Sequence, residues 1–236
     1  AEVGATGILI LYVNIFSAQH YYDLIGVPLA FVLMTLVTVA AFVLAVRLDA
    51  QVVAVLGLLG GFLTPPLLST GVDRPLALFS YIALLDLGML AIALRQRWNH
   101  HFLLAAVATV LMQVAWTAQF FIPEKIHTAL TIYFTFTLLF AAAFVYAHRL
   151  QASGIWSDAA ALLLPTVALC FVGYLLVRPY PTLAERPALL FGFVFLVDLA
   201  YLAAAALRDD LRPALAGAGA LVFGLLSLWT IQFLTP

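Results

Sequence analysis

Long apolar runs separated by short polar joints fill almost the whole chain. Each run approaches the roughly 20 residues that a helix needs to cross a bilayer, and a helix satisfies its own backbone hydrogen bonds there. Pro75, Pro187 and Pro213 stand at the starts of runs, where a missing N–H costs nothing. The pattern predicts nine transmembrane helices, at 3–20, 26–48, 51–70, 75–95, 101–122, 127–148, 157–177, 186–207 and 213–234.

The composition supports an all-α, polytopic membrane helix bundle with the lipid bilayer as its partner. Hydrophobic residues make up 66% of the chain and charged residues only 9%, and the mean hydropathy is +1.14. A soluble domain carries about a quarter charged residues. The net charge of −1 gives no reason to expect a nucleic-acid partner. No residues have metal-site spacing, so we expect neither a metal nor a cofactor.

The second half of the chain repeats the first. Arg74–Ala93 and Arg186–Ala205 share ten identities in twenty positions, including one Asp at the same depth. Further on, Trp116-Thr-Ala-Gln-Phe matches Trp229-Thr-Ile-Gln-Phe. Four predicted helices in 26–123 thus correspond to four in 124–236. An even number of spans gives both copies the same orientation, so the sequence predicts a parallel tandem duplication.

One predicted helix, in residues 1–25, is left over, and we interpret it as the end of a preceding repeat. The sequence begins with alanine, not methionine, and has no recognisable signal peptide. We therefore expect a piece of a longer chain, with further transmembrane repeats as partners. The second copy carries about twelve extra residues near 178–183.

The basic residues favour one orientation. Six lie on the side that holds the N-terminus, against four on the other side. Because cytoplasmic loops collect Lys and Arg, we expect a cytoplasmic N-terminus. The six are Arg47, Arg95, Arg97, Arg149, Arg208 and Arg212, and the four are Arg74, Lys125, Arg178 and Arg186.

Two stretches carry a family resemblance. Residues 58–71 (LLGGFLTPPLLSTG) and 77–88 (ALFSYIALLDLG) resemble a large bacterial family of predicted multi-pass membrane proteins, domain of unknown function 2339. The resemblance covers about 1–122. It implies a long polytopic chain in the bacterial inner membrane and brings no established activity.

Asp86 and Asp198 are the first candidates for an ion or substrate site. They lie midway along corresponding helices, and an ionisable group at mid-membrane costs about 2.5–3.5 kcal/mol, so it often marks a pathway. The alternative is a protonated Asp that hydrogen-bonds a neighbouring helix, worth about 0.6–2 kcal/mol. Gln113 and Asn14 are candidates because they could reach an Asp across a helix interface.

The third predicted helix is the second candidate. Gly57, Gly60 and Gly61 leave three positions in the middle of this helix without side chains, and Pro65 with Pro66 removes two backbone N–H donors. The pattern predicts a kinked or broken helix, of the kind that binds substrates in transporters. In the alternative, the glycines allow close helix packing and the prolines end the span.

Three function classes remain open at this level. We favour transport, or the handling of a lipid or envelope precursor, through a cavity between the two four-helix copies. The alternative is a non-catalytic scaffold module of a longer envelope protein. A membrane-embedded enzyme has the least support, because no nucleophile–base set or long polar loop is present.

Overall fold

Helices make up nearly all of the described structure. The computed structural model describes residues 2–69, 71–178 and 187–233, and these ranges contain no β-strand. The predicted all-α bundle is therefore confirmed. The helices are α1 (Glu2–His20), α2 (Val27–Leu48), α3 (Gln51–Leu67), α4 (Pro75–Gln96), α5 (His100–Phe120), α6 (Ile126–Arg149), α7 (Ile155–Val177), α9 (Pro187–Leu207) and α10 (Arg212–Phe233), with 3₁₀ turns η1 (Pro123–Lys125) and η2 (Asp209–Leu211).

In the described ranges, eight helices are long and apolar enough to cross a membrane. The predicted third span is the exception, because α3 has 17 residues and ends at Leu67, not at 70. At 1.5 Å per residue it is about 26 Å long, short of the roughly 30 Å hydrocarbon core. The predicted break in this segment is wrong, since α3 is continuous through Pro65 and Pro66. Both prolines lie in its last turn, and the helix ends directly after them at Leu67.

Tight turns join successive helices. Asp49, Arg97 and Gln151 follow the ends of α2, α4 and α6 with positive φ angles of 49°, 58° and 51°. At each turn the next backbone N–H returns to a carbonyl five residues earlier, as from Ala50 to Ala45 at 3.0 Å. Such left-handed caps satisfy the last carbonyls of a helix and reverse the chain at once.

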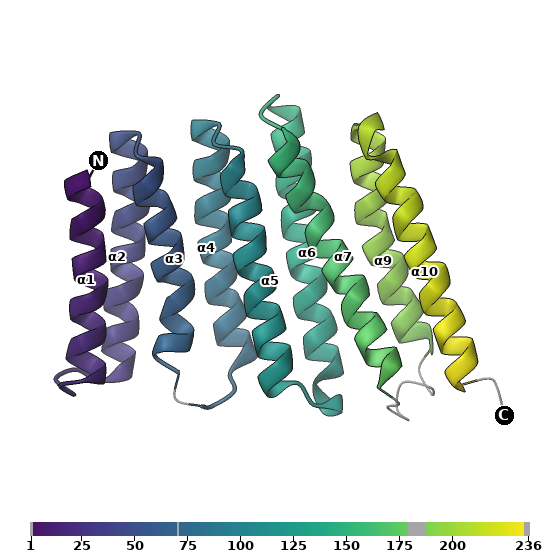
Figure 1. Cartoon of the computed structure of the whole chain (residues 1–236), viewed down its shortest axis with the longest axis horizontal. Helices are drawn as coiled ribbons and strands as arrows, with labels where there is room; N and C mark the ends of the chain where they lie inside the picture. The colour runs from purple at the N-terminus through teal and green to yellow at the C-terminus, as the bar shows by residue number, and fades with distance from the viewer. Residues whose placement is uncertain (1, 70, 179–186, 234–236) are drawn as a thin grey trace. The chain divides into compact units, whose positions relative to one another are not determined.

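The described helices form two compact units, residues 1–109 and 110–236, and α5 contributes to both. In the first unit α1 packs against α2 and α3, and α2 packs against α3 and α4. Figure 1 shows α1 and α3 in one layer and α2 and α4 in the layer behind. At the α2–α3 seam Ala41 lies directly beside Gly57, and α2 and α3 also bury the small residues Ala45 and Ala54. Small residues let two backbones approach closely in a membrane.

The second unit has the same alternation of layers. There α6 packs against α7 and α9, and α10 packs against α7 and α9. Phe136, Phe140 and Phe144 recur every four residues on one buried face of α6, as expected for side chains one helical turn apart. Phe171 of α7 stacks on Tyr133 of α6, with the ring centroids 4.4 Å apart.

The extra segment predicted in the second copy falls largely on residues 179–186, outside the described residues. The duplication, with its boundary between 123 and 124, stays a prediction.

Candidate functional site

Asp86 lies in a buried helix interface of the first unit. Its side chain is fully buried, near the middle of α4. The Thr109 hydroxyl, from α5, donates a 2.6 Å hydrogen bond to Asp86 Oδ2. Among the described residues, Oδ1 has no hydrogen-bond partner. This geometry is that of an interhelical hydrogen bond in a packed seam.

Side chains of neighbouring helices fill the space beside the α3 glycines. A Cβ atom added at Gly57 would lie 2.7 Å from the Cβ of Ala41 in α2. One added at Gly60 would overlap the ring of Tyr12 in α1. Gly61 is packed nearly as closely, against side chains of α2 and α4. Only glycine fits these positions without a shift in the neighbours, so the three glycines permit close packing of α3.

Pro65 leaves one α3 carbonyl without its helical donor. In an α-helix the carbonyl of Gly61 would accept the N–H of residue 65, which proline lacks. The Tyr81 hydroxyl, on α4, donates to this carbonyl at 3.1 Å. A second tyrosine, Tyr12, forms a 2.6 Å hydrogen bond with the Thr38 hydroxyl. These two buried tyrosines, which the sequence analysis missed, join α1, α2, α3 and α4.

The other two predicted site residues have different environments. Asn14 is exposed on α1, and its side-chain amide donates to the Ile10 carbonyl of the same helix at 2.8 Å. Gln113 is fully buried in α5, and neither atom of its amide has a hydrogen-bond partner in the described part of the chain. The structure does not bring Asn14 to Asp86.

Asp198 lies in an apolar groove of the second unit. The groove has a volume of about 360 Å³ and runs between α9 and α10. Among the described residues that line it, Asp198 is the one ionisable group, and it lies near the middle of α9. Its side chain is half-buried, and Oδ1 has no hydrogen-bond partner among the described residues. The remaining lining is Phe195, Leu199, Leu202, Leu215 and Gly219.

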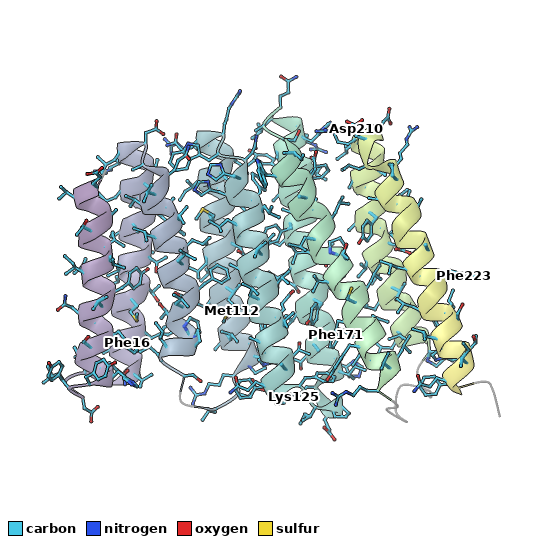
Figure 2. All side chains as sticks on the ribbon, viewed as in Figure 1. Phe16, Met112, Lys125, Phe171, Asp210 and Phe223 are labelled. Carbon is cyan, nitrogen blue, oxygen red and sulfur yellow. The ribbon has the colours of Figure 1, made fainter. Side chains whose placement is uncertain are left out.

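The groove walls reach the outer surface of the unit. The exposed fractions of Phe195, Leu199 and Leu202 are 63%, 43% and 52%. On the same helix pair, Phe223 projects from α10 with an exposed fraction of 72% (Figure 2). In a bilayer such faces contact lipid. The two predicted acids therefore differ, with Asp86 in a buried seam and Asp198 in an open groove.

A charged cluster at one end of the second unit also escaped the sequence analysis. Arg208, just after α9, pairs with Asp158 at the start of α7, with Nη2 and Oδ2 3.3 Å apart. Asp158 is nearly buried, whereas Arg208 is more exposed and also meets Asp210 at 3.4 Å. Asp210 lies at the end of the unit where α9 joins α10 (Figure 2). This cluster ties α7 to α9 at the edge of the spans.

The eight long apolar helices and the polar groups held within them define a multi-pass integral membrane protein. Its sequence matches the predicted membrane protein family DUF2339 over residues 3–234. The chain therefore belongs to that family, and the match extends well beyond the first half. No curated protein and no solved structure matches it.

Proposed function

We propose that this protein handles a lipid or another membrane amphiphile, which it binds in the α9–α10 groove with Asp198 as the polar anchor. The observation that carries the proposal is a half-buried carboxyl group with an unpartnered oxygen, set in otherwise apolar walls. The proposal keeps the lipid-handling class expected from the sequence. It relocates the site from a cavity between the two repeats to a groove within the second unit.

The position of Asp198 favours a site over a packing role. A polar group at mid-membrane is costly, and it usually pairs or serves a pathway. Asp198 has no described partner for Oδ1, so a bound molecule with one polar group would supply what the unit itself does not. The volume of about 360 Å³ falls at the lower end of the range for small-molecule pockets.

The depth of the groove favours transfer across the bilayer over simple storage. Transporters bind substrates near the membrane midplane, from which either side can be reached. An amphiphile whose polar end meets Asp198 would be halfway between the two leaflets. The proposal also includes three expectations from the sequence. Residence in the bacterial inner membrane rests on the family, a cytoplasmic N-terminus rests on the basic residues, and a tandem duplication rests on the repeat.

The test is saturable photolabelling of the purified protein in phosphatidylethanolamine–phosphatidylglycerol vesicles. The probe is a phospholipid with a diazirine in its acyl chain, and peptide mass spectrometry locates the label. We expect a label on α9 and α10 that excess unlabelled lipid removes. Gly219→Leu should abolish the competable label, because a side chain there fills the groove and no atom lies within 4 Å of its Cβ.

Gly217→Leu is the matched control. Gly217 lies on the same helix, has the same free space around its Cβ and does not line the groove. Equal competable labelling in the two variants would contradict the proposal. That result would favour the scaffold function, in which the groove is merely part of the lipid-facing surface.

A further inference from the structure

We infer that the molecule held in the α9–α10 groove is a long-chain alcohol, whose hydroxyl donates to Asp198 as the Thr109 hydroxyl donates to Asp86. This inference rests on the proposed function and names its ligand class. It draws on the comparison of two acids at corresponding positions, one with a hydroxyl partner and one without.

The repeat in the sequence sets the correspondence. Asp86 aligns with Asp198, and Trp116 aligns with Trp229. The second alignment places Val222 of α10 where Thr109 stands in α5. Valine has nearly the shape of threonine but no hydroxyl. The second copy has therefore kept the acid and lost its donor.

The groove-lining face of α10 is the counterpart of a buried face of α5. Leu215 and Gly219 line the groove, and Val222 follows one turn later on the same face. The aligned α5 residues are Phe102, Ala106 and Thr109, which are all buried. The change from Ala106 to Gly219 removes a methyl group at the groove wall. Gly219 thus leaves more space at the groove wall, and Val222 supplies no hydroxyl donor.

The missing hydroxyl partner of Asp198 and the apolar lining of the groove together indicate the class of ligand. Asp86 shows that a carboxyl group at this depth accepts a hydroxyl donor at 2.6 Å. A hydroxyl costs far less to bring to mid-membrane than a charged ammonium group. The rest of the groove is lined by Phe and Leu side chains and by Gly219, which suit an alkyl or prenyl chain. A long-chain alcohol combines both parts.

The experiment measures competition with the photolabel of the groove. Hexadecanol and its methyl ether have the same apolar chain, but only the alcohol donates a hydrogen bond. A hydrogen bond to a carboxylate contributes enough for a difference of about tenfold or more. We therefore expect hexadecanol to compete at least about tenfold better than the ether against the wild-type protein.

Four variants locate that preference. Asp198→Leu should remove it, whereas Asp198→Asn should retain it because an amide oxygen still accepts the hydroxyl. Val222→Thr should reduce the preference for the alcohol, since the new threonine hydroxyl would itself donate to the Asp198 carboxyl group. Val222→Ala should leave it unchanged. Because Asp198 and Val222 are both partly exposed, these changes avoid the packed core, and circular dichroism checks the helical content of each variant.

The outcomes separate the two proposals. Equal competition by alcohol and ether, with a label that Gly219→Leu still abolishes, would overturn the alcohol inference and leave the lipid-binding groove intact. Alcohol preference that survives Asp198→Leu would also overturn the inference. If the wild-type protein shows no label that excess lipid can remove, the proposed function itself is contradicted.

Discussion

The hydroxyl of Tyr81 donates a hydrogen bond to the carbonyl oxygen of Gly61 at 3.1 Å. That carbonyl is the one that Pro65 leaves without its helical N–H. One helix thus supplies a donor that its neighbour has lost, inside a medium where no water can take the donor's place. The arrangement explains how Pro65 sits in α3 without leaving the Gly61 carbonyl unpaired.

Tyr81→Phe should destabilise the protein by about 1 kcal/mol, because the Gly61 carbonyl then has no donor. Pro65→Ala restores a backbone N–H at residue 65. The tyrosine change should therefore cost much less in the Pro65→Ala background. Thermal unfolding in detergent of the two single variants and the double variant gives this coupling. Additive losses would mean that the tyrosine hydroxyl does not replace the missing N–H.

Thr109→Val should lower the unfolding free energy by about 1–2 kcal/mol, because it leaves the buried Asp86 carboxyl group without its donor. Asp86→Asn should be much milder, since the amide oxygen still accepts the threonine hydroxyl. The control is Thr131→Val, because the Thr131 hydroxyl donates to the His127 carbonyl of its own helix. If Thr109→Val unfolds like Thr131→Val, the hydrogen bond to Asp86 contributes nothing measurable.

Gly57→Ala should destabilise the first unit by about 1–3 kcal/mol through overpacking. The added methyl group would meet the Cβ of Ala41, which the backbone holds in place. At Gly192 an added Cβ has open space, so Gly192→Ala should be neutral or slightly stabilising. Unfolding in detergent distinguishes the two. A normal unfolding temperature for Gly57→Ala, together with loss of photolabelling, would instead indicate a ligand site along α3.

Substituting either partner of the ion pair between Arg208 and Asp158 should lower the free energy of unfolding by different amounts. Arg208→Gln leaves a nearly buried carboxylate without its cation, and we expect a loss of about 2 kcal/mol. Asp158→Asn leaves Arg208 partly exposed and still beside Asp210, so the loss should be less than about 1 kcal/mol. Equal losses would show that burial of Asp158 does not govern the pair. Chemical unfolding of each variant measures the difference.

Hydropathy was enough to predict the helices, because a span must be long and apolar whatever its neighbours are. The predicted limits agree with the described helices to within a few residues, except at the end of α3. There the sequence showed two prolines that remove donors. It could not show that the Tyr81 hydroxyl would replace one of the missing donors by bonding to the Gly61 carbonyl, because that depends on how α3 packs against α4.

The mid-membrane acids were also visible in the sequence, but their environments were not. Which of many threonines donates to Asp86 depends on the rotation of α5, and helical periodicity alone leaves several choices. The sequence did not show that Thr109 would donate to Asp86, or that Gly219 would line a groove beside Asp198.

The short link between α2 and α3 has a consequence for biosynthesis. Only Asp49 and Ala50 separate the two helices, and the cap at Asp49 closes the turn on the α2 carbonyls. Because the link is so short, we expect α2 and α3 to enter the bilayer together as one hairpin during synthesis. In that hairpin the longer α2 would accompany the shorter α3.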